Sequence, residues 1–167
     1  MGNLIRIVQK PKVFRFLMNF WPPLVGAGIK VRHISEDFRK IVVSMSLTWY
    51  NRNYIGTHFG GSLFAMTDPF FMLMLVHILG KGYRVVDHAA SINFVSPGMG
   101  RVTATFSITD EQIEAIKSAT ESGQKHFAEF KVDVLNSQDI KVATVEKRIY
   151  IRRRVPLQTK KANLISD

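Results

Sequence analysis

One segment of the chain, residues 53–68, contains residue types whose spacing could support chemistry. Asn53 precedes the pair Gly60-Gly61, and Asp68 follows seven residues after the second glycine. Glycines let a backbone approach a ligand closely, and the first N–H groups of a helix are unpaired and lie at the positive end of its dipole. Such N–H groups stabilise a carbonyl oxygen that gains negative charge. The segment therefore predicts a site for carbonyl chemistry.

Asp68 is the carboxylate of this segment, and an apolar run from Pro69 to Leu79 follows it. A helix that is apolar all round must be buried, so we expect Asp68 to be semi-buried. A semi-buried charge is costly, so we also expect it to have a function or a structural role. A carboxylate there could activate water or attack a carbonyl directly. A structural alternative is that Asp68 caps the helix and Pro69 occupies its first position, and the two roles can coexist.

The other residues of the segment also have structural interpretations. Gly60-Gly61 could permit tight packing, Asn53 could be an ordinary turn residue, and His58 could be a turn or surface histidine. The chain has no cysteine, which excludes disulfides, thiolate nucleophiles and cysteine-ligated zinc. Its histidines lack metal-ligand spacing, so we expect no metal site. Its serines lack a Gly-x-Ser-x-Gly motif, which argues against a serine hydrolase.

Length and composition indicate one globular domain. The chain has 167 residues, 46% of them hydrophobic, and a chain of this length can bury a proper core. The apolar run 69–79 is shorter than the roughly 20 residues of a transmembrane helix. Arg15, Asn19 and Pro22-Pro23 interrupt what could have been a signal-peptide core. We therefore expect a cytoplasmic protein.

Positive charge gathers at the two ends of the chain. The net charge is +10, and residues 1–35 contain six basic residues and no acid. Residues 147–167 contain seven basic residues and one acid. Such ends could meet a polyanion or simply solubilise the protein. The aromatic, basic leader suits weak contact with a membrane surface, whereas nucleic-acid binding is not expected because interleaved stacking aromatics are mostly missing.

Hydrophobic patterns predict a sheet of antiparallel strands. Alternation of apolar and polar residues, or a β-branched run, marks strands at 39–50, 87–96, 101–109, 126–135 and 140–153. Thr109 and Gln112 fit a capping box that starts a short surface helix, which ends before Gly123. Ahead of the strands, residues 11–29 are dense in aromatic side chains and predict helical segments broken at Pro22-Pro23.

The predicted order is a helical leader, a strand, the buried helix, two strands, the short helix and two strands. A curved antiparallel sheet wrapped around one long apolar helix would bury all sides of that helix. We therefore predict an α+β fold with a helical leader (1–37), a sheet-and-helix domain (38–153) and a basic flexible tail (154–167).

With this order of elements the chain resembles the hotdog fold of acyl-CoA thioesterases, especially the phenylacetyl-CoA thioesterase type. The motif of that type is similar to Asn-x-x-Gly-x-x-His-Gly-Gly with an Asp seven residues later. The matching positions, within a resemblance that spans residues 38–152, are Asn53, Gly56, Gly60, Gly61 and Asp68.

The chain departs from the family motif at two positions. Phe59 stands where the family has histidine, and His58 lies one residue earlier. Pro69 follows Asp68, which removes one helical hydrogen bond and disfavours helical geometry at Asp68. The chain thus resembles a divergent branch of the superfamily.

The resemblance implies hydrolysis of acyl-CoA or acyl-carrier thioesters, with coenzyme A present only as part of the substrate and no other cofactor. It implies that the Gly60 and Gly61 N–H groups polarise the thioester carbonyl and that Asp68 activates water or attacks. Asn53 is expected to orient that water. Further residues are expected to contact the substrate, namely Gly56, His58, Phe59, Phe64, Phe71, Asn93 and Phe94.

The spacing of the segment predicts a homodimer. Seven helical steps from Gly61 to Asp68 span about 10 Å, so one subunit cannot bring both to the same carbon. A second copy whose helix runs in the opposite direction could complete the site, as a two-fold axis arranges. Hotdog proteins are similar in that their sites lie between subunits, and a dimer of dimers is also compatible.

Two other function classes stay open at this point. One is a hotdog hydratase or dehydratase, a chemistry that resembles a paired histidine and acid on the buried helix. The other is a non-catalytic acyl-binding or membrane-associated module, which the leader suggests. The acyl chain cannot be predicted, because an apolar tunnel distinguishes chain lengths by only roughly 1 to 3 kcal/mol per methylene.

Overall fold

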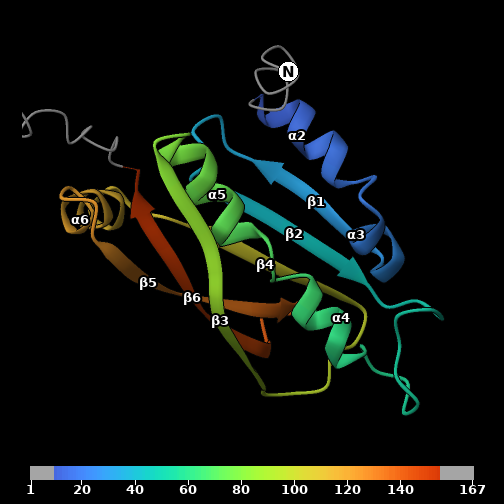
Figure 1. Cartoon of the computed structure of the whole chain (residues 1–167). Helices are drawn as coiled ribbons and strands as arrows, with labels where there is room; N and C mark the ends of the chain where they lie inside the picture. Colours follow the sequence, from blue (N-terminus) through green and yellow to red (C-terminus); the bar gives the residue numbers. More distant parts are fainter. Residues whose placement is uncertain (1–9, 155–167) are drawn as a thin grey trace, which may run out of the picture.

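The computed structural model describes residues 10–154 (Figure 1). Two short helices lead into a sheet whose strands flank the central helical segment. The elements in chain order are α2 (Pro11–Met18), α3 (Pro22–Ala27), β1 (Ile29–Ile34), β2 (Lys40–Ser46), α4 (Gly60–Ala65), α5 (Phe70–Leu79), β3 (Tyr83–Phe94), β4 (Arg101–Ser107), α6 (Asp110–Ala119), β5 (Lys125–Asn136) and β6 (Lys141–Arg153).

The six strands form one antiparallel sheet in the order β1-β2-β4-β5-β6-β3. The alternation in the sequence decides which side chains face inward. In β2 and β4, for example, the paired residues Val43 and Ala104 are both buried. The predicted α+β architecture, a curved antiparallel sheet around an apolar helical segment, is confirmed.

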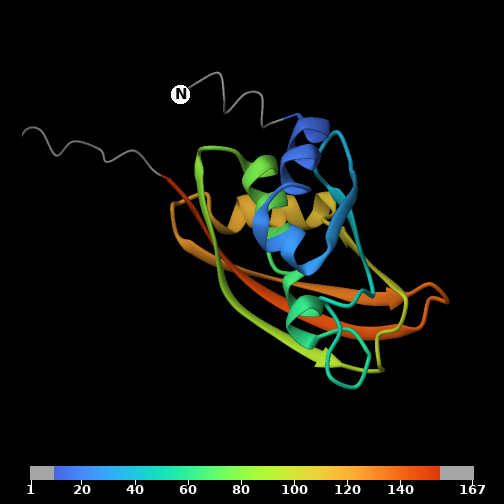
Figure 2. The ribbon, with the colours of Figure 1, turned by 90° about the vertical axis from the view of Figure 1, so that its right-hand side faces the viewer.

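The core lies between the sheet and α5, which runs above the curved strands (Figure 2). The Phe71 ring stacks on the Phe130 ring at 4.7 Å and meets the Phe106 ring edge-on at 5.1 Å. All three side chains are buried. Aromatic rings bury large apolar areas and prefer such offset or edge-on contacts, so this cluster fixes α5 against β4 and β5.

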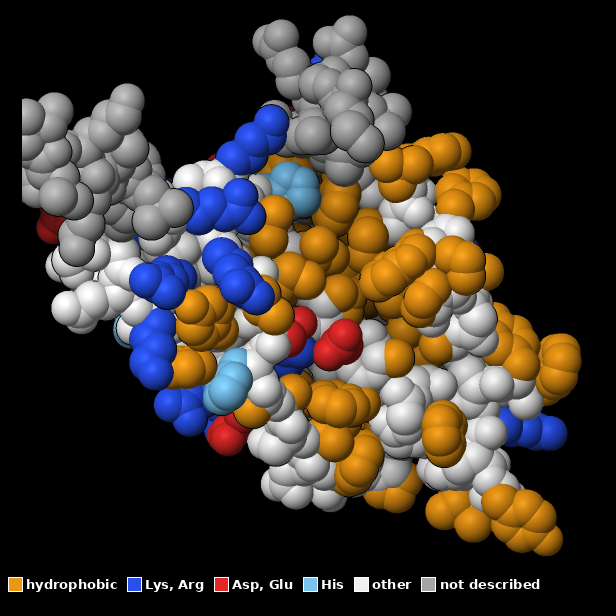
Figure 3. Space-filling model, in the orientation of Figure 1, with side chains coloured by type: hydrophobic (Ala, Val, Ile, Leu, Met, Phe, Trp, Pro, Cys, Tyr) orange, Lys and Arg blue, Asp and Glu red, His pale blue; other side chains and the backbone are white. Residues whose placement is uncertain are grey.

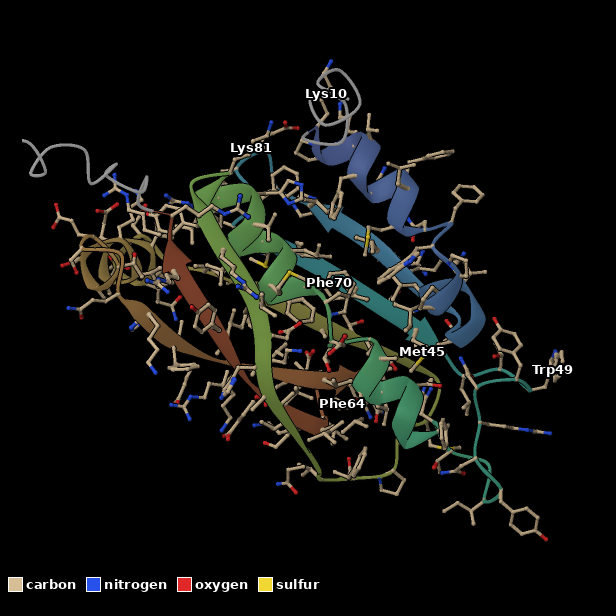
Figure 4. All side chains as sticks on the ribbon, in the orientation of Figure 1. Lys10, Met45, Trp49, Phe64, Phe70 and Lys81 are labelled. Carbon is tan, nitrogen blue, oxygen red and sulfur yellow. The ribbon has the colours of Figure 1, made fainter. Side chains whose placement is uncertain are left out.

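The central helical segment is broken into α4 and α5. Proline at position 69 lacks an N–H group and disfavours helical geometry in the residue before it, so the helix ends near Met66 and restarts at Phe70. Phe64 and Phe70 lie on either side of this break (Figure 4). The whole span Gly60–Leu79 is long and apolar enough to cross a membrane, but 56% of its most apolar window is buried inside the structure, as in the core helix of a soluble protein.

The strand β1 lies inside the segment predicted to be a purely helical leader, and that part of the prediction was wrong. Its three polar residues Lys30, Arg32 and His33 mask the pattern in which Ile29, Val31 and Ile34 face inward. The helices α2 and α3, to which we limit the name leader from here on, are separated just before Pro22, as predicted.

Two local predictions concern the ends of elements. The capping box that starts α6 is confirmed, because the Thr109 hydroxyl accepts from the Gln112 N–H and the Gln112 side chain accepts from the Thr109 N–H. The predicted basic tail lies outside the described residues from position 155 onward.

Candidate active site

The loop 51–59, which enters α4, is organised by Asn53. The Asn53 Oδ1 accepts hydrogen bonds from the Ile55 and Thr57 N–H groups, and its Nδ2 donates to the Thr57 hydroxyl at 2.8 Å. Gly56 at the tip has a φ of +88°, a conformation that suits glycine. In these contacts Asn53 is a turn residue. Its predicted role in orienting water stays a prediction.

A hydrogen bond of His58 links the end of this loop to the turn before β4. The His58 ring is buried, and Nε2 lies 3.0 Å from the Gly100 carbonyl oxygen. A carbonyl only accepts, so Nε2 carries a proton, and in the neutral ring Nδ1 then carries none. Among the described residues, Nδ1 has no hydrogen-bond partner. Burial lowers the pKa of His58 below 6.5, because a charged ring would lose its hydration there.

The helix α4 begins with Gly60 and Gly61, which we call the glycine tip. Phe59 precedes the helix in an extended conformation, and the Ser62 and Leu63 N–H groups bond back to its carbonyl. In residues 10–154, no backbone acceptor pairs with the N–H of Gly60 or Gly61. These two groups are therefore the unsatisfied donors of the helix start.

Two exposed phenylalanines lie against the glycine tip. A Cβ atom at Gly60 would come within 2.9 Å of the Phe94 ring, and one at Gly61 would contact the Phe59 ring even more closely. Both rings are more than half exposed. The glycines thus allow an apolar, solvent-open wall beside the unpaired N–H groups.

Asp68 lies at the break between the two helices and makes an ion pair across the fold. Its Oδ1 accepts from the Nζ of Lys147 on β6 at 2.9 Å. The Asp68 side chain is 58% exposed, so it is less buried in one chain than predicted. It does not cap α5, whose first turn has no side-chain cap.

Lys147 also reaches a second carboxylate, Asp87 on β3, with Nζ 3.0 Å from Oδ1. The Lys147 side chain is almost completely buried, at 1% exposure. A buried ammonium group needs compensating charge, which the two carboxylates supply. Burial raises the pKa of Asp87, and the neighbouring Lys147 partly offsets that rise. The cluster of Asp68, Asp87 and Lys147 carries one net negative charge when all three are ionised.

Sequence reasoning missed Lys147 and Asp87, although β6 contains a signal. Its inward positions are apolar at Val145, Ile149 and Ile151, and Lys147 interrupts that row. A lysine where the alternation demands an apolar residue indicates a buried charge with a partner. Figure 3 shows acidic side chains beside a basic one within a hydrophobic area on this face.

The remaining predicted substrate contacts lie in different surroundings. Phe64 is half-buried in α4, Phe71 is inside the core, and Asn93 is exposed on β3 next to Phe94. The structure therefore brings Phe59 and Phe94 to the glycine tip, and Gly56 and His58 to the loop that leads into it. It does not bring Phe71 to that surface in a single chain.

The glycine tip and Asp68 lie at opposite ends of α4. Phe94, which touches Gly60, and Ala90, which pairs with Lys147, are four residues apart on β3. Four residues of extended strand span about 13 Å. The donors and the carboxylate of one chain therefore face different points along the same strand.

β3 forms a free edge of the sheet and is largely exposed. Its backbone pairs only with β6 within the described residues, and Val86 and Phe94 are exposed along it. An uncovered edge strand offers a row of backbone donors and acceptors to another chain. The opposite edge, β1, is covered by the leader, because the Asn19 side chain exchanges two hydrogen bonds with the backbone of Val31.

Comparisons with known proteins agree with this fold. Residues 10–151 match the family model described as "Domain of unknown function (DUF4442)". No curated protein matches the chain. Among solved structures, the Pseudomonas aeruginosa protein PA5026, described as a probable thioesterase, is 18% identical with a TM-score of 0.75, covering 87% of this chain and 99% of that one.

Two further structures have the same architecture. The Haemophilus influenzae thioesterase HI1161 is 14% identical, with a TM-score of 0.64 and coverage of 89% of this chain and 94% of that one. The E. coli PaaI protein of the phenylacetic acid degradation operon is 21% identical, with a TM-score of 0.59 and coverage of 84% and 89%. The predicted hotdog fold is therefore confirmed.

Proposed function

Because the chain belongs to the DUF4442 family of hotdog-type domains, we propose that it is a thioesterase that hydrolyses acyl-CoA or acyl-carrier thioesters at a site shared by two copies of the chain. The observation that carries this proposal is the ion pair between Asp68 and the buried Lys147. The pair holds a solvent-facing carboxylate beside a buried cation, and a general base needs such a fixed position.

Pairing of two β3 edges would bring the glycine tip of one chain close to Asp68 of the other. The exposed stretch of β3 is centred near Ser91, so we place the two-fold axis there, with Ser91 facing the same residue of the partner. Antiparallel pairing about that point sets Phe94 opposite the partner's His88. The glycine tip of one chain then lies beside Asp68 of the other.

In this arrangement the reaction has balanced proton and bond changes. The Asp68 carboxylate takes a proton from water, and the water oxygen attacks the thioester carbonyl carbon. The Gly60 and Gly61 N–H groups of the other chain stabilise the oxyanion. The intermediate then expels the thiolate, and the proton held by Asp68 passes to the sulfur to give the free thiol and the carboxylic acid.

The contacts of His58 weigh against the hydratase alternative. That chemistry needs a histidine that can exchange a proton with the substrate. His58 is buried, and its protonated Nε2 is bonded to the Gly100 carbonyl. We therefore favour hydrolysis over water addition to an enoyl thioester.

The test is release of free thiol from a panel of acyl-CoA esters, detected with a thiol reagent. The wild-type protein should hydrolyse at least one ester, and Asp68→Asn should lower kcat by about 100-fold or more. A matched control is Asp139→Asn, in the β5–β6 turn, which should retain the wild-type rate because asparagine suits the left-handed φ of 58° there. Full activity of Asp68→Asn, or no hydrolysis of any ester by the wild type, would overturn the proposal.

A further inference from the structure

Aromatic and aliphatic side chains are exposed on the leader and on two neighbouring turns. Phe16 is 62% exposed and Phe20 is 67% exposed, with their rings 4.7 Å apart. We use the name leader surface for the exposed residues on this side of the molecule, which are Phe16, Leu17, Phe20, Trp21, Val25, Trp49, Tyr50, Tyr54 and Ile55.

Two parts of the leader surface, α3 and the turn at residues 49–50, are joined to each other. The Asn51 Nδ2 donates to the carbonyl of Ala27 at the end of α3, which fixes the turn that carries Trp49 and Tyr50. The Tyr50 ring packs against Gly28 at the start of β1. Trp49 points away from the body of the protein (Figure 4), and groups of hydrophobic side chains lie on this side of the space-filling view (Figure 3).

The fold does not require these side chains to be apolar. The inner face of α2 already contributes Phe14 and Met18 to the core, and Asn19 satisfies the backbone of β1. Phe16 and Phe20 lie outside that contact. Several exposed aromatic residues on one side of the molecule indicate an interaction site.

The same surface is strongly basic. Residues 10–35 contain no acid. Within the described part of the chain, no carboxylate lies within ion-pair distance of Lys12, Arg15, Lys30 or Arg32. A hollow of about 510 Å³ between α2 and β1 is lined by Lys12, Arg15 and Arg32 together with Phe16 and Phe20.

We propose that the leader surface docks onto a lipid bilayer that contains anionic headgroups. Aromatic side chains favour the boundary between headgroups and acyl chains, and unpaired Lys and Arg attract anionic lipid. A second copy of this chain fits less well, because a two-fold contact would bring two acid-free basic surfaces together. The free β3 edge lies on the other side of the sheet order, so docking and β3 pairing can coexist.

The experiment is co-sedimentation of the full chain with vesicles of phosphatidylcholine containing phosphatidylserine and with vesicles of phosphatidylcholine alone. We expect binding to the first and little to the second. The double variant Phe16→Ser/Phe20→Ser should lose most binding, because both rings are already exposed and the fold does not depend on them. The variant Lys12→Glu should weaken binding by at least about fivefold, the equivalent of roughly 1 kcal/mol per removed charge.

Matched controls come from surfaces far from the leader. Ile140→Ser removes an exposed aliphatic side chain from the β5–β6 turn. Lys125→Glu reverses an exposed charge on β5, where Lys125 pairs with the basic residue Arg152 of β6. Both should bind like the wild type. Equal loss in Lys125→Glu, no binding to either vesicle, or a smaller native mass of Phe16→Ser/Phe20→Ser would overturn the proposal, the last by identifying a contact between protein chains.

Discussion

The ammonium group of Lys147 lies 2.9 Å from the carboxylate of Asp68, a residue 79 positions earlier in the chain. One partner is buried and the other faces solvent. Lys147 also contacts Asp87, so a single buried cation links the helix break to the free edge strand. This link explains how an exposed carboxylate can have a fixed position.

Replacing Lys147 with methionine tests that link. Methionine has a similar length and suits a buried site, so the protein should still fold. Its stability should be lower than that of the wild type, because Asp87 loses its cation. We expect kcat/KM to fall by about 10- to 100-fold, because Asp68 loses its fixed position. The pKa of Asp87 should rise further, since the offset from Lys147 is gone. Activity assays and carboxyl NMR titrations measure these two effects.

The control for Lys147→Met is Lys131→Met on β5, where the side chain is exposed. It should change neither the rate nor the Asp87 titration. If Lys147→Met kept both at wild-type values, Lys147 would have no role in positioning Asp68.

Gly60 offers a test of the backbone donor at the helix start. Gly60→Pro removes the N–H, while proline suits the first helical position and the extended conformation of Phe59. Gly60→Ala adds a similar Cβ, which displaces the exposed Phe94 ring, but keeps the N–H. We expect kcat to fall about 100- to 1,000-fold in Gly60→Pro and far less in Gly60→Ala. Equal losses in both variants would mean that the N–H does not act.

His58 predicts a pH dependence of stability. Burial lowers its folded-state pKa below the 6.5 of an exposed histidine, so the unfolded chain binds a proton more readily. The stability is complete above about pH 6.5, falls as the pH drops through that value, and levels off below the lowered pKa. Urea unfolding over this range should show the loss.

The variant His58→Gln removes the titrating ring while its side-chain amide can still donate to the Gly100 carbonyl. Its stability should depend less on pH below about 6.5 than that of the wild type. His33→Gln, at an exposed position on β1, should leave the wild-type dependence in place. An unchanged slope in His58→Gln would show that another group titrates.

A cysteine at Ser91 tests the proposed two-fold axis. The chain has no cysteine of its own, so a new thiol can pair only between copies. Directly opposed residues in antiparallel strands have Cα atoms about 4.5 to 5.5 Å apart, within the range of a disulfide. Mild oxidation of Ser91→Cys should give a covalent dimer on a non-reducing gel. Ser137→Cys, in the β5–β6 turn, should stay a single chain, and cross-linking of both alike would indicate random collision.

Local patterns in the sequence predicted most of the fold. Alternation or a β-branched run marked five of the six strands, and Thr109 and Gln112 marked the start of α6. The sequence pattern predicted one long apolar helix, which Pro69 divides into α4 and α5. The missed strand β1 is short, and half of its residues are polar. Each confirmed feature depends on residues close together in the chain, where periodicity and capping rules apply.

The candidate site was predictable only where its contacts are local. The glycine tip follows from Gly60 and Gly61, and the loop bonds of Asn53 join residues two to four positions apart. The partners of Asp68 are different, because they depend on the register that sets β3 against β6 and on the packing of both against the helix break. A periodic pattern in the sequence does not specify contacts between residues so far apart in the chain.

The most direct test of a site shared between chains is complementation between two inactive variants. Gly60→Pro and Asp68→Asn are unfolded together and refolded as a mixture. In a mixed dimer one site combines the intact glycine tip of one chain with the intact Asp68 of the other, so random mixing should restore about one quarter of the wild-type sites. We predict that thiol release from an acyl-CoA ester recovers to that level. A mixture no more active than the two separate variants would contradict the shared site.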